Sequence, residues 1–283
     1  FQIREFNPTR VIVTFDGKDG SKSRKKIHEG YKADRAKNRF RVNRAYGDMM
    51  TEEEEKLSMR QQFVWLNDML DYLPVQTMIY DGIEADDTIA YLTQHTQYEL
   101  DGEVVIVSTD KDFLQLVSDK VSVFSPTKKK MYNRQVVFDE FGIWPQNLLL
   151  YRTLDGDKSD NIPGIKGCGI KTLLKRFPEL SEDRLITHDE LFQLCEDKQG
   201  KIKLYTDILE AKDQLLMNKR LMELDEPHIP TEKKLKILDR FREDDVEFNK
   251  LDFLRVGAKY KVLQNWRDIN DWLQSTFHNI ITK

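Results

Sequence analysis

The segment EVVIVSTDKDF, from Glu103 to Phe113, joins a run of β-branched residues to two aspartates. A short and continuous apolar run of this kind predicts a buried strand of a parallel sheet. Two further predicted strands lead into acids in the same way, namely VIVTF before Asp16 and the strand at 75–80 before GIEADD. Helical patterns at 51–73 and 84–98 alternate with these strands, so the sequence favours an α/β fold with a mostly parallel sheet and flanking helices.

Caps, periodicity and helix breakers predict the remaining elements. Thr51 and Glu54 form a capping box at the start of the first long helix, which ends before Pro74. Beyond about Trp144 helical patterns dominate. We expect a short helix at 111–117, a strand at 121–124, helices at 147–154, 170–177 and 189–196, a long amphipathic helical segment at 201–224, and a linker at 227–230 before the last helices.

Acidic residues gather where the predicted strands end. Because the C-terminal ends of parallel strands share one edge of a sheet, these acids should lie close together although they are far apart in the sequence. Two carboxylates about 4 Å apart repel by roughly 4 kcal/mol at an effective dielectric near 20, so the cluster needs compensating cations. All-oxygen ligands select Mg²⁺ or Mn²⁺, and a group of this size favours two ions. The group comprises Asp16, Glu84, Asp86, Asp87, Asp110 and Asp112, together with Asp157 and Asp160 of GDKSDN.

An alternative reading assigns each acid to a surface turn or to a helix N-terminus, where Asp and Glu are favoured. That interpretation accounts for any one of these acids taken alone. Three predicted strands that all end in acidic residues favour the metal site instead.

The stretch from Lys18 to Arg44 is strongly basic, although the chain as a whole carries a net charge of −4. It holds eleven basic residues against three acidic ones, a net charge of +8, with Tyr31, Phe40 and Tyr46 interleaved. Such a segment can neutralise phosphates while its aromatic rings stack on bases, which favours nucleic-acid binding. The alternative is a solvated charged loop.

The glycine-rich stretch GIKGCGIKT, from Gly164 to Thr172, is not a P-loop, because Ile170 separates the last glycine from Lys171 and no strand precedes it. It lies between two predicted helices, where glycines let the backbone approach a phosphate at the next helix N-terminus. The alternative is a tight turn without a ligand.

The amino-acid composition indicates a globular protein without a membrane-spanning segment. The 283 residues are 39% hydrophobic and 33% charged, as in ordinary globular proteins with a rich charged surface. No apolar run approaches the roughly 20 residues that cross a bilayer, so we expect no membrane association. Cys168 and Cys195 lack CxxC spacing and the five histidines are scattered, which disfavours a zinc site and suggests a reduced compartment.

Five segments together resemble the 5′-nuclease family, which includes the flap endonucleases of bacteriophages and the 5′→3′ exonuclease domain of bacterial DNA polymerase I. They are TFDGK at 14–18, YKADR at 31–35, GIEADD at 82–87, STDKDF at 108–113 and GDKSDNIPGIKGCGIKT at 156–172. The resemblance covers roughly residues 10–180, and the order and spacing of the segments are those of the family.

The resemblance implies a two-metal phosphodiesterase of replication or repair, with a PIN-like α/β core. Asp16, Glu84, Asp86 and Asp87 would serve one Mg²⁺ ion, partly through water, and Asp110, Asp112, Asp157 and Asp160 the other, with Mn²⁺ able to substitute. Lys32 and Arg35 would act on the scissile phosphate as catalytic residues.

The resemblance also implies how DNA is held. Residues 1–150 would form the nuclease core with a basic helical arch at about 18–50, residues 151–225 a helix–hairpin–helix region with K⁺ at its glycine turn, and residues 226–283 a helical extension. We expect a monomer in the cytoplasm of a bacterial cell or of a phage-infected bacterium. Its partner would be DNA with a 5′ end, flap or fork, or an RNA–DNA hybrid. The expected DNA contacts are Arg24, Lys25, Tyr31, Lys32, Arg35, Gly164, Lys166, Gly167, Gly169, Lys171 and Thr172.

One part of the family pattern is absent from the printed sequence. The family has a further strand with an Asp-Gly pair well before the position of Asp16, and residues 1–15 hold no aspartate. We therefore expect a chain that begins inside a domain and is an incomplete catalytic unit. The alternatives to a nuclease are a DNA-binding module with impaired catalysis and a PIN-type ribonuclease.

Overall fold

The computed structural model describes residues 2–34, 51–198, 200–243 and 248–281. The chain forms two compact units, of which the first takes residues 1–16, 39–80 and 231–283 and the second takes residues 17–38 and 81–230. Arg35 and most of the expected arch fall outside the described residues. The domain boundaries that the sequence predicts at 150 and 225 stay predictions. No helix in the described ranges is long and apolar enough to cross a membrane.

The first unit contains a parallel pair of strands, β1 (Ile12–Phe15) and β2 (Gln76–Ile79), with Ile12 opposite Gln76. Its core is rich in aromatic rings, and Trp266 meets Trp272 edge-to-face with ring centroids 4.2 Å apart. The helices of this unit are α1 (Gln2–Phe6), α4 (Glu52–Leu70), α12 (Thr231–Arg242), α13 (Lys250–Lys259), the 3₁₀ turn η4 (Leu263–Asn265) and α14 (Ile269–Ile281). The capping box predicted at the start of α4 is confirmed.

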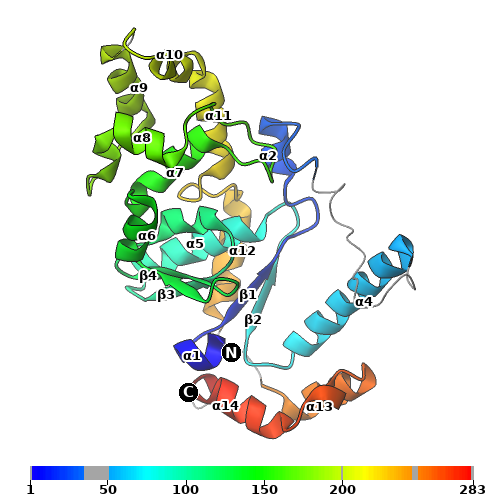
Figure 1. Ribbon diagram of the computed structural model, residues 1–283. Helices are drawn as coiled ribbons and strands as arrows, with labels where there is room; N and C mark the ends of the chain where they lie inside the picture. The colour runs from blue at the N-terminus through cyan, green and yellow to red at the C-terminus, as the bar shows by residue number, and fades with distance from the viewer. Residues whose placement is uncertain (1, 35–50, 199, 244–247, 282–283) are drawn as a thin grey trace. The chain divides into compact units, whose positions relative to one another are not determined.

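The second unit contains a three-stranded sheet of β3 (Val104–Val107), β4 (Val121–Ser125) and β5 (Lys130–Tyr132). Strands β3 and β4 are parallel, and β5 is antiparallel to β4. Around the sheet and beyond it lie α2 (Lys22–Ile27), α5 (Ala85–Tyr98), η2 (Lys111–Leu116), α6 (Arg134–Phe141), α7 (Pro145–Asp155), α8 (Ile170–Arg176), η3 (Pro178–Ser181), α9 (His188–Asp197), α10 (Lys203–Glu210) and α11 (Lys212–Met222) (Figure 1).

The predicted fold class is confirmed, with mainly parallel strand pairs and a helical region after residue 144. Two expectations need correction. The described strands lie in two small sheets, β1-β2 and β3-β4-β5, and not in one. The long helical segment expected at 201–224 is two helices that break at Ala211, because α10 packs on α9 while α11 packs on α7.

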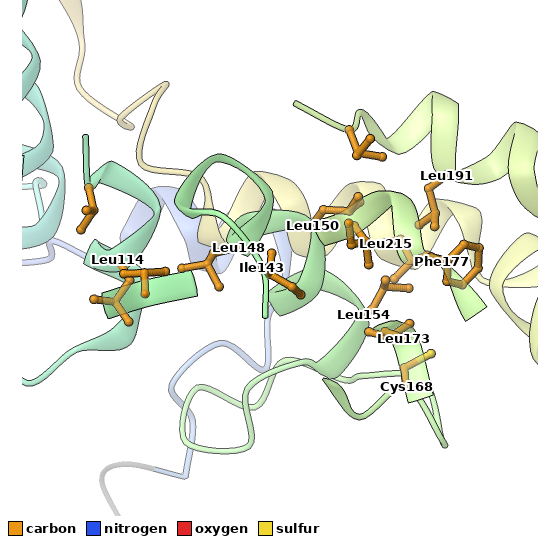
Figure 2. Packing of buried hydrophobic residues seen from close by; sticks show 14 of the residues in the cluster. Leu114, Ile143, Leu148, Leu150, Leu154, Cys168, Leu173, Phe177, Leu191 and Leu215 are labelled. Carbon is orange, nitrogen blue, oxygen red and sulfur yellow. The ribbon is translucent and has the colours of Figure 1, made fainter. Parts of the chain in front are cut away.

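Helix α7 lies at the centre of the main hydrophobic core of the second unit. Figure 2 shows Leu148, Leu150 and Leu154 of α7 among leucines and Phe177 from the neighbouring helices, all buried. The backbone then turns sharply at Gly156, where a Cβ atom would lie 2.4 Å from the amide nitrogen of Gly164. The rigid core therefore fixes the start of the loop that carries GDKSDN.

Candidate active site

A buried arginine joins two of the predicted metal ligands. Arg24 of α2 donates to Glu84 Oε2 at 2.7 Å and to both carboxylate oxygens of Asp87 at 2.7 and 2.9 Å. Its Nε–H donates to the Leu221 carbonyl at 2.8 Å. Arg24 is only 2% exposed, and burial alone would lower its pKa, but the bonds and charges of Asp87 and Glu84 raise the pKa on balance. Asp87 Oδ1 also accepts the backbone N–H of His228 at 3.1 Å.

This placement differs from the sequence-based expectation that Arg24 contacts DNA. A bidentate arginine–carboxylate pair with every group hydrogen-bonded is the form in which buried charges are tolerated. Arg24 therefore lies inside the protein as the ion-pair partner of Glu84 and Asp87. Its neighbour Lys25 is exposed on the same helix, and its contact with DNA stays a prediction.

Tyr31 and Lys32 extend this cluster from the segment YKADR. The Tyr31 hydroxyl donates to Glu84 Oε2 at 3.4 Å, and the Lys32 ammonium forms an ion pair with Glu84 Oε1. Burial, followed by the charge of Glu84, raises the pKa of Tyr31. The charges of Asp160 and Asp86 add to this rise in the pKa of Tyr31, whereas Arg24 opposes it. Tyr31 is buried here, whereas the sequence suggested a ring that stacks on a base.

A second cluster forms around Arg152 in the last turn of α7. Its Nε–H donates to Asp112 Oδ1 at 2.9 Å, and its terminal nitrogen donates to Asp157 Oδ2 at 2.6 Å. Asp110 caps η2 by accepting the backbone N–H of Asp112 at 2.9 Å. Burial raises the pKa of Asp112 to about 6, with Arg152 opposing the rise and the charge of Asp110 adding to it. Although burial acts to raise it, bonds from Ser159 and Arg152 lower the pKa of Asp157.

Sequence reasoning did not single out Arg152. A usable signal was present, because an arginine five residues before Asp157 on the same helix end can reach the carboxylate of the following turn. The partner Asp112 is 40 residues away and could not be identified from spacing.

The donor chemistry of both clusters fits a hard divalent cation. Carboxylates outnumber cationic groups in each: the first combines Glu84, Asp86, Asp87 and Asp160 with Arg24 and Lys32, and the second combines Asp110, Asp112 and Asp157 with Arg152. Within the described residues no three acids lie close enough to hold one ion as they stand. Asp16 follows β1 in the first unit and is exposed.

The glycine turn is open to solvent. Cβ atoms placed on Gly167 or Gly169 would meet nothing within 4 Å, and Gly167 has a φ of +90°. Lys166, Lys171 and Thr172 are exposed around it, and Gly169 is the N-cap of α8. Its accessible backbone fits the expected phosphate contact, whereas Gly164 instead packs against the Asp155 carbonyl.

Comparison with known proteins places these features in a family. Residues 2–142 match the family model described as the 5′-3′ exonuclease, N-terminal resolvase-like domain. A 5′-3′ exonuclease of Aquifex aeolicus is 32% identical over 77% of this chain and 73% of its own length. One from Bacillus subtilis is 32% identical over 75% of this chain and 66% of its own. A DNA polymerase I of Caldicellulosiruptor bescii is 30% identical, and the match spans 23% of that longer protein.

Solved structures agree with this assignment at the level of the fold. T5 5′-exonuclease with bound divalent zinc ions has a TM-score of 0.62 and 23% identity, with 90% of this chain and 87% of that chain covered. The bacteriophage T5 flap endonuclease in a complex with DNA and metal ions has a TM-score of 0.62 and 21% identity, with 91% and 87% covered. The chain has the α/β fold of the 5′-nucleases and belongs to the 5′-3′ exonuclease family, so the resemblance stated from its motifs is confirmed.

Proposed function

We propose that this chain is a metal-dependent, structure-specific 5′-nuclease that hydrolyses DNA near a 5′ end. The observation that carries the proposal is the ion pair between the Lys32 ammonium and the buried Glu84 carboxylate. It brings a phosphate-binding cation to the acidic start of α5, where Asp86 and Asp87 follow Glu84. Family membership supports the reaction class, and the open glycine turn supports a second contact with the DNA backbone.

Within the second unit, Glu84 and Asp86 would serve one divalent ion, and Asp110, Asp112, Asp157 and Asp160 another. Bound Mg²⁺ would supply an activated water and would neutralise charge on the reacting phosphate. Arg24 engages both oxygens of Asp87, so in this proposal Asp87 orients Arg24 and, through it, Glu84. The prediction that Asp16 also serves one of the two ions stays a prediction.

Lys32 has the chemistry to bind the scissile phosphate. Its side chain keeps 15% of its surface exposed, and its ammonium carries three rotatable donors on a flexible stem. A phosphate arriving at the carboxylate edge would take over donors that now bind Glu84. Donors aimed at developing charge lower the barrier to phosphoryl transfer, and the products would carry a 5′-phosphate and a 3′-hydroxyl.

The test compares Lys32→Ala with Lys22→Ala, an exposed lysine of α2, on a 5′-flap DNA in Mg²⁺ and in EDTA. Loss of an electrostatic donor should lower the single-turnover rate of Lys32→Ala by roughly a hundredfold. Lys22→Ala should mainly weaken binding and flatten its salt dependence. Equal effects of both substitutions on rate and binding would refute a catalytic Lys32.

The same assay separates the other functions. DNA binding without cleavage in Mg²⁺ or Mn²⁺ would identify a binding module, and cleavage confined to RNA would identify a PIN-type ribonuclease. Calorimetry with Mn²⁺ tests the ions directly: Asp86→Asn and Asp112→Asn should each weaken binding, because fewer anionic oxygens offset the dehydration of the ion. Unchanged stoichiometry and affinity in both variants would remove the metal site from the proposal.

A further inference from the structure

Two turns from distant parts of the chain are joined by three hydrogen bonds. The Asn161 amide donates from Nδ2 to the Gly30 carbonyl at 3.1 Å, and His28 donates from Nε2 to the Asn161 carbonyl at 3.1 Å. The backbone N–H of Lys32 donates to the Asp160 carbonyl at 3.0 Å. The turn at 28–32 is therefore fixed to the loop at 157–162, which lies more than a hundred residues later.

The backbone of both turns is shaped for this junction. Asn161 has a φ of +60° and Lys32 a φ of +56°, a left-handed conformation that asparagine tolerates far better than most residues. A Cβ atom on Gly30 would lie 2.9 Å from Asn161 Nδ2 and 2.9 Å from His28 Nε2, so a larger residue here would displace these two side chains. The loop itself is closed by paired bonds between Asp157 and Ile162 at 2.8 and 2.9 Å.

A buried apolar cluster also holds the two turns together, independently of the three hydrogen bonds. Tyr31 and Ile162 belong to one small buried cluster with Leu221 and Met222. Asn161 itself is exposed and adds nothing to that cluster. Loss of its amide should therefore change how the turn at 28–32 is oriented without unfolding the second unit.

We propose that Asn161 is a positioning residue that sets the position of the Lys32 side chain relative to the Glu84 carboxylate. The inference rests on the proposed function, in which Lys32 acts on the scissile phosphate. The Asn161 amide fixes the Gly30 carbonyl, the Asp160 carbonyl fixes the Lys32 amide, and the Lys32 ammonium then reaches Glu84. One short loop thus carries two predicted ligands and also orients the cation that faces them.

The decisive variant is Asn161→Asp, which keeps the size and the left-handed tolerance but places a carboxylate oxygen opposite the Gly30 carbonyl. The matched control is Asn7→Asp, the same substitution at an exposed asparagine with a φ of +47° in the first unit. Asn161→Gly is a second variant that removes the donor and relaxes the backbone, for use if Asn161→Asp lowers the melting temperature by more than a few degrees.

Single-turnover rates and DNA dissociation constants are measured for each variant on a 5′-flap substrate with Mg²⁺. Misplacement of a reacting group by about an ångström costs up to a hundredfold in rate, so we expect at least a tenfold loss in Asn161→Asp with DNA affinity changed less than about threefold. Asn7→Asp should match the parent protein. Hydrogen exchange of the Lys32 amide, measured without DNA or metal, should accelerate in Asn161→Asp alone.

A double-mutant cycle with Lys32→Ala separates positioning from general damage. If Asn161 acts through Lys32, Asn161→Asp slows the reaction no further once Lys32 is alanine. Rate losses that multiply in the double variant, or an unchanged exchange rate of the Lys32 amide, would overturn the inference. A Lys32→Ala variant with full activity would instead overturn the catalytic assignment of Lys32 in the proposed function.

Discussion

Replacement of Arg24 by alanine should destabilise the second unit strongly. The residue is 2% exposed, and its removal leaves the buried carboxylate of Asp87 without its ion-pair partner. Glu84 would keep only its contacts with Lys32 and Tyr31. The substitution also deletes the bond to the Leu221 carbonyl that ties α2 to α11. Removing one partner of a buried ion pair costs roughly 3–5 kcal/mol because the remaining charge is left without compensation. Against a total free energy of unfolding of about 5–15 kcal/mol, this is a large fraction.

Native-state hydrogen exchange in α5 and α11, with EDTA present, reports the loss for the second unit alone. Lys25→Ala is the matched control, because Lys25 is exposed on the same helix and should cost less than about 0.5 kcal/mol. Arg24→Lys should fall between the two, since an ammonium keeps the charge but lacks the planar fork that meets Asp87 at two points. A loss below about 1 kcal/mol in Arg24→Ala would refute the reasoning.

DNA binding gives an independent check on the same residue. A lysine or arginine that contacts a phosphate contributes about one to the slope of log affinity against log salt. Lys25→Ala should lower that slope, whereas Arg24→Ala should leave it unchanged. A lowered slope with normal stability in Arg24→Ala would show that the guanidinium faces DNA, as the sequence alone suggested.

Three further results are expected. Burial lowers the pKa of His188 to about 4, so the unfolded chain binds a proton at a higher pH than the folded chain does. The free energy of unfolding should therefore decrease as pH falls from about 6.5 towards 4. His188→Gln should flatten that part of the stability–pH curve measured by urea unfolding. Gly156→Ala should lower the free energy of unfolding by about 1–4 kcal/mol, because φ is +73° and the new methyl meets Gly164, whereas Gly169→Ala, with open space around its Cβ, should unfold like the parent. Lys171→Ala should reduce the salt slope of duplex binding by about one in filter-binding or anisotropy titrations, and an unchanged slope would exclude a phosphate contact at the glycine turn.

The elements with strong local patterns were predictable from the sequence. The run EVVIVS forms β3, and Thr51 with Glu54 caps α4, because β-branched runs and capping boxes specify structure through neighbouring residues. Strand β5 and helix α6 were missed, since three residues of strand hold no readable period and Arg134–Phe141 is short. The break at Ala211 depends on the helices that α10 and α11 pack against, which are α9 and α7. The sequence of 201–224 alone does not identify these packing partners.

The residue types of the candidate site were predictable, but the pairing was not. Arg24 is one of eleven basic residues in its stretch, and nothing local distinguishes it from exposed Lys25 or Lys26. Its partners Glu84 and Leu221 lie 60 and 197 residues away. Arg35 was predicted from its motif, and it falls outside the described residues. Long-range pairing of this kind is decided by the packing of α2 against α5 and α11, which a single sequence does not reveal.

The two arginines offset the charge of the clustered carboxylates in the folded chain. Each joins two predicted ligands. Arg24 joins Glu84 and Asp87 at the start of α5, and Arg152 joins Asp112 of η2 to Asp157. Without them, neighbouring carboxylates would repel by roughly 4 kcal/mol per close pair at an effective dielectric near 20. The Arg152 side chain stays 16% exposed and that of Arg24 only 3%. Solvent screens the ion pairs of Arg152 more than those of Arg24 and so weakens them. In the proposed function, a divalent ion would therefore displace Arg152 from its carboxylates more easily than Arg24.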